Sequence, residues 1–387
     1  MEFPKTLHLF CHVVDNLGDI GVGWRLARQL AAEHGIQVVL WLDDLGSLKK
    51  ICSALDPLQS KQQILGVTIQ RWRDDFGADE ANDAADVVIE AFGCQLPPPY
   101  LEAMAKRSVA PAWINLEYLS AEAWVEGCHR LASPHPVLPL TKYFFFPGFT
   151  ERTGGLLLER GLLARRAAFQ ENPAAMADFL SRLGVSVPPN VRKVSLFCYP
   201  DAPVGALFDA FAADAGNPVL CLVPEGVAAA AVGEFLGQPA KAGVSAERGG
   251  LRVHVLPFVD QDDYDKLLWS CDMNFVRGED SFVRAQWAAR PFVWNIYPQE
   301  EQAHLIKLDA FIKLYETALP AGHGKIVSEF WRSWNSGGGA GRSERGKWRL
   351  FQSILPDLTR IGPSWAYKLS QNGDLASGLI QFIRGLR

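Results

Sequence analysis

Two carboxylates and a carboxamide lie in one short turn near the N-terminus of the chain. Asp15, Asn16 and Asp19 follow an apolar run at residues 6–14, which is expected to form a buried strand. A carboxylate at the end of a strand in an α/β sheet points into the crevice where such sheets bind ligands. Asp15 and Asp19 therefore suit general-base catalysis or the binding of a cationic acceptor.

The glycines of this turn do not form a dinucleotide fingerprint. Gly18, Gly21 and Gly23 give the spacing G-x-x-G-x-G, whereas a dinucleotide site requires G-x-G-x-x-G. Two aspartates would also repel a phosphate group at this position. A structural alternative is that Asp19 caps a helix starting at the following residue. That alternative explains Asp15 less well, because Asp15 lies at the strand end before the turn.

A second cluster of charged residues follows an expected strand at residues 273–276. Arg277, Glu279, Asp280 and Ser281 stand where a helix over residues 281–289 is expected to begin. Backbone N–H groups at a helix N-terminus, beside a guanidinium and a hydroxyl, can bind an anion such as a nucleotide diphosphate. The structural alternative is a helix N-cap formed by Asp280 or Ser281.

Aromatic residues end two further expected strands in the second half of the chain. Phe197 and Tyr199 follow one strand, and Phe258 follows another, three residues before Gln261. Rings at these positions can stack on a nucleobase, and Gln261 can hydrogen-bond it. The alternative for Phe197 and Phe258 is a place in the apolar core.

The elements that position these residues alternate in two series. Apolar runs expected to be strands lie at residues 6–14, 37–42, 86–92 and 112–116, and again at 194–199, 219–223, 251–256, 273–276 and 292–295. Helical spacing lies between many of them, at 20–34, 206–213, 261–270, 281–289 and 300–315. Strands buried on both faces read as continuous apolar runs, with helices between them. The pattern predicts an α/β protein with two Rossmann-like domains in tandem, whose sheets face each other across a cleft.

Composition changes mark the expected domain borders. We expect an N-terminal Rossmann-like domain at residues 1–155, a partly helical linker at 156–190 and a C-terminal Rossmann-like domain at 191–363. A C-terminal helix at 364–387 is expected to return to the first domain, by analogy with other two-domain folds. A glycine-rich loop is expected at 336–346. The acidic residues between Asp260 and Asp265 are interpreted as a solvated helix face.

The bulk composition excludes several classes of protein. The chain has 387 residues, of which 48% are hydrophobic and 21% charged, and its net charge is −5. Length predicts about two domains, and the charge argues against a general polyanion binder. The seven cysteines are scattered with no CxxC pair, which favours a reducing compartment and argues against a zinc site. No apolar run approaches the ~18 residues of a membrane span. We therefore expect a soluble cytoplasmic protein.

Two long motifs resemble one known family. The sequence FCHVVDNLGDIGVGWRLA at residues 10–27 and the sequence RGEDSF at 277–282 are similar to those of the elongation factor P arginine rhamnosyltransferases (the EarP family). The resemblance spans essentially the whole chain. It implies a GT-B glycosyltransferase that uses dTDP-β-L-rhamnose as donor and needs no metal or other cofactor. It also implies an acceptor arginine on a loop of folded elongation factor P, inversion at the sugar, and support of polyproline translation.

The resemblance also implies roles for individual residues. Asp15 and Asp19 match carboxylates of an N-terminal acceptor-binding domain, and Glu279 matches the catalytic glutamate of a C-terminal nucleotide-sugar-binding domain. On chemical grounds we assign Asp19 as the base and Asp15 as its partner or orienter. Glu279 is expected to orient the guanidinium, to stabilise charge on the sugar or, alternatively, to hold the helix turn. The remaining positions match substrate contacts: Asn16, Gly18, Phe197, Tyr199, Phe258, Gln261, Arg277, Asp280, Ser281 and Tyr297. No nucleic acid or membrane partner is expected.

Three other functions remain to be weighed against this one. The first is another GT-B nucleotide-sugar transferase with a lipid, glycan or small-molecule acceptor, for which a basic amphipathic helix would be a sign. The second is an NAD-binding oxidoreductase, which the missing G-x-G-x-x-G makes a weak rival. The third is a non-catalytic binding module, which the clustered carboxylates make less attractive.

Overall fold

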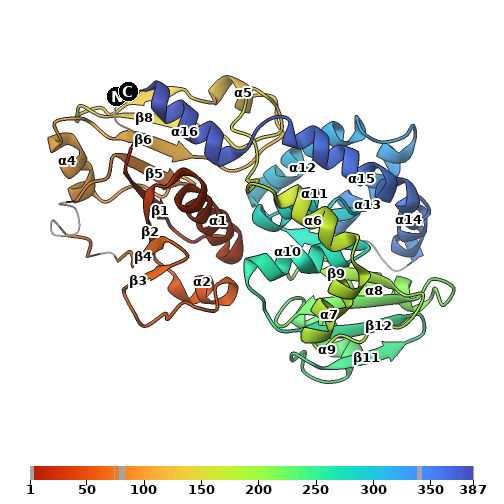
Figure 1. The fold of residues 1–387 in the computed structure, drawn as a ribbon. Helices are drawn as coiled ribbons and strands as arrows, with labels where there is room; N and C mark the ends of the chain where they lie inside the picture. The colour runs from red at the N-terminus through yellow and green to blue at the C-terminus, as the bar shows by residue number, and fades with distance from the viewer. Residues whose placement is uncertain (1–3, 74, 78–82, 338–341, 387) are drawn as a thin grey trace. The chain divides into compact units, whose positions relative to one another are not determined.

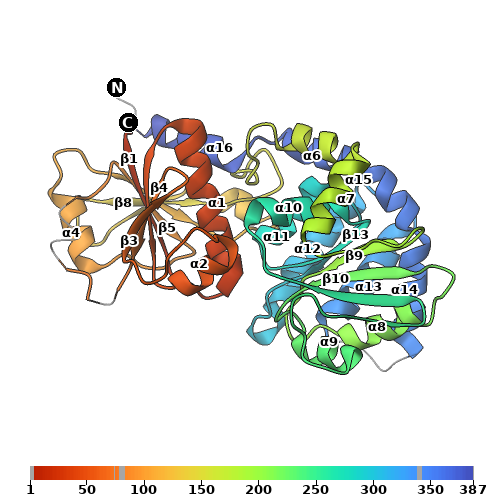
Figure 2. The ribbon, with the colours of Figure 1, turned by 60° about the horizontal axis from the view of Figure 1, so that its bottom comes forward.

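The chain forms two compact α/β units. The computed structural model describes residues 4–73, 75–77, 83–337 and 342–386. One unit contains Met1–Arg160 together with Leu369–Arg387, and the other contains Gly161–Lys368. Figures 1 and 2 show each unit as a twisted sheet covered by helices.

The sheet of the first unit is mostly parallel. Its strands are β1 Thr6–Cys11, β2 Gln37–Leu42, β3 Lys61–Ile64, β4 Val67–Arg71, β5 Val87–Ala91, β6 Ala112–Leu116, β7 Ala132–Pro134 and β8 Thr141–Phe145. Their order is β3-β4-β2-β1-β5-β6-β8-β7, with antiparallel hairpins β3–β4 and β7–β8 at the edges. The six inner strands are parallel and follow the Rossmann order 3-2-1-4-5-6. The order therefore reverses between β1 and β5.

Helices cover both faces of this sheet because its inner strands are apolar on both sides. The helices are α1 Asn16–His34, α2 Leu45–Ile51, α4 Pro98–Lys106, α5 Val125–Cys128 and α16 Leu375–Gly385. Leu7 and Leu9 of β1 share a core with Leu30 of α1 and Leu379 of α16. Phe10, which points to the opposite face, packs in the core that includes Tyr100 and Met104 of α4.

The second unit repeats the design with a smaller sheet. Its strands are β9 Arg192–Leu196, β10 Val219–Pro224, β11 Ser245–Arg248, β12 Leu251–Leu256, β13 Met273–Arg277 and β14 Phe292–Asn295. Their order is β11-β12-β10-β9-β13-β14, and all pairs except β11–β12 are parallel. Here the strand order reverses between β9 and β13.

The helices of the second unit occupy the spaces between its strands and the segment after β14. They are α6 Leu162–Gln170, α7 Pro173–Arg182, α8 Val204–Ala212, α9 Ala229–Leu236, α10 Gln261–Ser270, α11 Asp280–Ala288, α12 Ala303–Glu316, α13 His323–Asn335, α14 Arg342–Ser353 and α15 Leu355–Ser370, with a short 3-10 helix η1 at Glu300–Gln302. The described residues of the second unit thus form a Rossmann-like layer structure with a helical extension.

Several segments differ from the sequence-based expectation. The expected linker at 156–190 contains α6 and α7, both within the second unit. The glycine-rich loop expected at 336–346 is helical from Arg342 onward, while residues 338–341 lie outside the described part of the chain. The single helix expected at 364–387 is two helices, α15 and α16, and α16 packs with α1 in the first unit. In Figure 1 this blue helix lies among the red and yellow elements of that unit.

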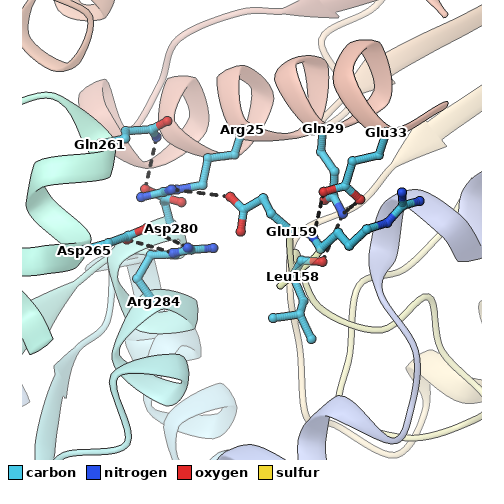
Figure 3. A network of polar contacts seen from close by, with 10 residues as sticks. Arg25, Gln29, Glu33, Leu158, Glu159, Gln261, Asp265, Asp280 and Arg284 are labelled. Carbon is cyan, nitrogen blue, oxygen red and sulfur yellow. Dashed lines mark hydrogen bonds and ion pairs between the residues drawn. The ribbon is translucent and has the colours of Figure 1, made fainter. Parts of the chain in front are cut away.

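Helix α1 also holds the two chain segments that leave and re-enter the first unit. Gln29 Nε2 donates to the Leu158 carbonyl at 3.0 Å, a contact drawn in Figure 3. The same atom donates to Asp374 Oδ1 at 3.1 Å. The backbone N–H of Arg160 donates to Glu33 Oε1 at 2.6 Å. These bonds fix the C-terminal half of α1, whose N-terminal end contains the acidic turn.

Candidate functional site

The two motif clusters of the sequence lie at the two reversals of strand order. Asp15 and Asp19 follow β1, and Arg277 ends β13 with Glu279 just after it. At such a reversal the two adjacent loops leave the sheet in opposite directions, which opens a crevice at the carboxyl ends of the strands. Each unit therefore places polar side chains where Rossmann-like sheets bind ligands.

The first crevice is built around the N-terminus of α1. The helix begins at Asn16 and not after Asp19, so the alternative in which Asp19 caps the helix is wrong. Asp15 occupies the N-cap position, but its side chain makes no capping hydrogen bond. Asp19 lies in the first turn, and its Oδ2 accepts hydrogen bonds from the N–H groups of Val14 at 2.9 Å and Asp15 at 2.8 Å. The Asp19 carboxylate is thus turned back toward the strand end.

Gly18 provides the space that the Asp15 carboxylate occupies. A Cβ atom at position 18 would lie 2.3 Å from Asp15 Oδ2, and the Gly18 N–H donates to the Asp15 carbonyl at 2.6 Å. Any side chain at this position would push the Asp15 carboxylate out of its place. The side chain of Asn16 lies outside the described residues.

A third carboxylate joins this turn from the next strand. Asp43 follows β2, and its Oδ1 accepts a hydrogen bond from the Val13 N–H at 3.0 Å. Its Oδ2 lies 2.7 Å from Nδ1 of His12, whose side chain is 59% exposed. The sequence analysis did not name Asp43, although an aspartate directly after the apolar run at 37–42 was the available signal.

The surroundings of Asp19 favour its protonated form more than water does. Burial raises the pKa of Asp19 above the ordinary aspartate value, and the negative charge of Asp43 raises it further. The N–H groups of Asp15 and Val14 and the hydroxyl of Tyr118 act in the opposite direction. A carboxylate with a raised pKa is a stronger base, which suits proton abstraction from a weakly acidic nucleophile.

The second crevice contains Arg277 between two aromatic rings. Its guanidinium carbon lies 4.6 Å from the ring centre of Phe197 and 4.7 Å from that of Tyr199. Both rings are buried, and Phe197 also packs edge-on against Tyr264. The two rings that were expected to stack on a nucleobase thus hold the arginine in place by cation–π contact.

The loop between β13 and α11 is fixed by its own hydrogen bonds. Helix α11 begins at Asp280, with Glu279 at the N-cap position and no side-chain cap. Ser281 Oγ accepts from the Arg277 N–H at 3.0 Å, and Gly278 has φ of 60°, a conformation that glycine adopts without strain. Trp294 Nε1 donates to the Gly278 carbonyl at 2.8 Å. The alternative in which Asp280 or Ser281 is the N-cap residue is therefore wrong, because Glu279 occupies that position.

Two polar pairs tie α10 to α11, as Figure 3 shows. Gln261 Nε2 donates to Asp280 Oδ2 at 3.2 Å. Arg284 donates twice to Asp265, from Nε at 2.9 Å and from Nη2 at 2.6 Å, and the two side chains are 2% and 5% exposed. The interpretation of residues 260–265 as a solvated acidic face is wrong for Asp265, which is a buried ion-pair partner.

Two aromatic residues of the predicted site remain accessible. Phe258 is 36% exposed and Tyr297 is 38% exposed. Tyr297 packs edge-on against Tyr199, with ring centres 5.5 Å apart. The structure therefore groups Phe197, Tyr199, Arg277 and Tyr297, while Phe258 lies in the loop between β12 and α10, before Gln261.

Two further features are absent from the described part of the chain. Within residues 4–73, 75–77, 83–337 and 342–386, no group of three or more His, Cys, Asp or Glu side chains is placed to hold a metal ion. In the same part of the chain, every helix is too short or too polar to cross a membrane.

Comparisons with known proteins agree on one family. The chain matches the family described as "Elongation-Factor P (EF-P) rhamnosyltransferase EarP" over residues 7–384. A protein from Pseudomonas putida named protein-arginine rhamnosyltransferase is 48% identical over 380 residues, which cover 98% of this chain and 98% of the relative.

Solved structures show the same likeness at the level of the fold. A structure described as "Structural basis for EarP-mediated arginine glycosylation of translation elongation factor EF-P" is similar with a TM-score of 0.69 and 37% identity, over 98% of this chain and 99% of that chain. A glycosyltransferase from Rickettsia africae has a TM-score of 0.52 at 10% identity, over 99% and 97% of the two chains. That second likeness concerns the fold alone. The likeness to the EarP structure supports a GT-B class of fold with two Rossmann-like units.

Proposed function

The chain belongs to the elongation factor P rhamnosyltransferase family, and from this premise we propose that it transfers L-rhamnose to an arginine side chain of elongation factor P. The donor is dTDP-β-L-rhamnose, and the product is an α-rhamnosyl-arginine formed with inversion. The modified factor then supports translation of polyproline sequences, which makes the cytoplasm the place of action.

The acidic turn of the first unit is the observation that supports this function best. Asp15, Asp19 and Asp43 gather at the carboxyl ends of β1 and β2, around an N–H network that fixes two of them. A cluster of carboxylates attracts a cation, and a guanidinium can bind two carboxylates in its plane. An arginine acceptor fits this cluster better than a neutral sugar hydroxyl does.

Asp19 is the proposed base for the chemical step. A guanidinium is a poor nucleophile because its charge is delocalised and its pKa is above ~12. A carboxylate that accepts one Nη–H proton localises a lone pair on that nitrogen as the bond forms. The nitrogen then bonds to the anomeric carbon, the bond from that carbon to the dTDP oxygen breaks, and the proton passes to Asp19.

The second unit supplies groups that suit the nucleotide. The leaving dTDP gains negative charge, and Arg277 offers a fixed positive charge at the carboxyl end of β13. Preorganised donors of this kind stabilise charge that develops in a transition state. Arg277 and the amides that begin α11 would replace the divalent metal that other transferases use, so no metal is required in this proposal. Glu279 is proposed to orient the guanidinium or to stabilise charge on the sugar.

Intact-mass analysis of elongation factor P tests the proposed reaction. The purified chain is incubated with dTDP-rhamnose and with elongation factor P, either unchanged or with lysine in place of the loop arginine. We expect a gain of one deoxyhexose on the unchanged factor alone. No gain in mass, from a chain that is folded and binds dTDP, would reject the proposal and favour another acceptor.

A further inference from the structure

Two aromatic residues lie at the same sheet edge as the acidic turn, after the next two strands. Phe92 follows β5 and Tyr118 follows β6, and these strands are parallel neighbours with Ala91 opposite Leu116. The Phe92 N–H extends the ladder by donating to the Leu116 carbonyl at 2.7 Å. The carboxyl ends of β1, β2, β5 and β6 therefore contribute side chains to one edge of the sheet.

The two rings form a stacked pair with a constrained backbone. Their ring centres are 4.4 Å apart, and their planes differ by 16°. Phe92 has φ of 59°, in the left-handed region that side chains other than glycine rarely adopt. The loop that follows Phe92 is tied back to β5, since the Leu96 N–H donates to Glu90 Oε1 at 3.1 Å. Strain of this kind persists where the surrounding structure imposes it, often beside functional groups.

The stacked tyrosine reaches the carboxylate proposed as the base. The Tyr118 hydroxyl acts on the Asp19 carboxylate as a hydrogen-bond donor and lowers the pKa of that carboxyl. Two backbone N–H groups already occupy Oδ2 of Asp19, so Tyr118 is a third donor and arrives from a different strand. Three donors from two directions leave a carboxylate with little rotational freedom.

We propose that Tyr118 is a positioning residue for the arginine transfer, acting through its hydrogen bond to Asp19 and supported by the Phe92 ring. The proposal rests on the proposed function, because it assumes that Asp19 accepts the proton. Tyr118 holds the carboxylate in one orientation, so that its remaining lone pairs face the acceptor. It also keeps the carboxylate ionised at a lower pH than the site would otherwise allow.

The direction in which Tyr118 changes the pKa of Asp19 follows from the groups that face this carboxyl. The negative charge of Asp43, which is paired with His12, favours the protonated form, as does burial. On β1, the Cys11 thiol is buried and stays protonated, because burial and the nearby charge of Asp19 raise its pKa. Tyr118 donates to the ionised form and opposes these effects. Removing its hydroxyl should therefore raise the pKa of Asp19.

The Tyr118→Phe variant tests the proposal through the pH dependence of kcat/KM for elongation factor P. We expect the acidic limb to move upward by about one pH unit, roughly a tenfold change in proton concentration, with activity recovering at higher pH. Tyr143→Phe is the matched control. Its ring lies in β8 and packs against Phe382, with ring centres 5.5 Å apart, away from the carboxyl-end turn. The acidic limb of the pH profile of Tyr143→Phe should coincide with that of wild type.

The outcomes separate this inference from the proposed function. A pH titration of the Asp19 carboxyl carbon signal by NMR measures the pKa of Asp19 without any substrate. The signal is assigned by its disappearance in Asp19→Asn. A shift of that titration in Tyr118→Phe, in a protein that does not modify elongation factor P, would keep the contact and remove the proposed function. An active Tyr118→Phe variant whose limb coincides with wild type, or one that loses activity equally at every pH, would overturn the positioning role.

Discussion

The Asp19 carboxylate accepts the backbone N–H of Asp15 at 2.8 Å, so the two aspartates of the acidic turn are fixed relative to each other. This contact keeps the Asp19 side chain at the strand end. We expect Asp19→Asn to abolish rhamnose transfer while leaving dTDP affinity nearly unchanged, since the amide cannot accept a proton. Intact-mass rates and calorimetry measure the two quantities, with Asp263→Asn as a control on the surface of α10. Full transfer activity in Asp19→Asn would reject the base assignment.

The same variant should not be less stable at neutral pH. The folded state raises the pKa of Asp19, chiefly through burial, so the ionised carboxylate costs folding free energy above that pKa. This cost is absent at pH values below the unfolded pKa and is fully present above the folded one. We therefore expect the Tm of Asp19→Asn at neutral pH to equal or exceed that of wild type. A clearly lower Tm would mean that lost activity reflects unfolding.

Asp43→Asn should move the acidic limb of the pH profile in the direction opposite to Tyr118→Phe. The Asp43 charge raises the pKa of Asp19, so its removal lowers that pKa and extends activity to lower pH. The asparagine oxygen can still accept the Val13 N–H. Asp44→Asn is the matched control, because Asp44 caps α2 by accepting the Ser47 N–H at 3.0 Å and asparagine caps equally well. If the acidic limbs of the Asp43→Asn and Asp44→Asn profiles coincide, the Asp43 charge does not raise the pKa of Asp19.

Arg277→Ala should weaken dTDP binding without unfolding the second unit. A hydrogen bond to a charged group is worth about 1.5–3 kcal/mol, so we expect roughly a 10- to 150-fold rise in Kd by calorimetry. Arg252→Ala is the control, since Arg252 forms an ion pair with Glu247 in the β11–β12 hairpin. Equal affinities of the two variants would remove the diphosphate role of Arg277.

Breaking the buried pair of Asp265 and Arg284 should destabilise the second unit strongly. Asp265→Asn removes the negative charge that faces the buried Arg284 guanidinium, and breaking a buried ion pair costs about 3–5 kcal/mol. Urea denaturation measures this loss. Asp178→Asn breaks an ion pair on the surface, in which the side chain of Arg182 is 62% exposed and that of Asp178 is 75% exposed. This variant should lose far less stability. Similar losses in both variants would show that burial of the Asp265 pair does not matter.

The apolar pattern predicted the sheet interiors well and their edges poorly. Strands expected at 37–42, 112–116, 251–256 and 292–295 have those bounds in the structure, because buried parallel strands need continuous apolar residues. The β3–β4 hairpin was missed. β3 reads Lys-Gln-Gln-Ile, and its turn uses Leu65 and Gly66, both with positive φ, in place of the Asn-Gly that signals such turns.

Contacts between segments distant in sequence explain what else was missed. Helical spacing cannot show that Asp265 meets Arg284 of another helix, or that Phe197 and Tyr199 close on Arg277. The sequence by itself determined the alternation of strands and helices, and with it the position of Asp15 and Asp19 at a strand end. Only the tertiary structure decided which partners reach them, because Asp43 and Tyr118 approach Asp19 through the lateral order of β2, β1, β5 and β6, which local periodicity does not encode.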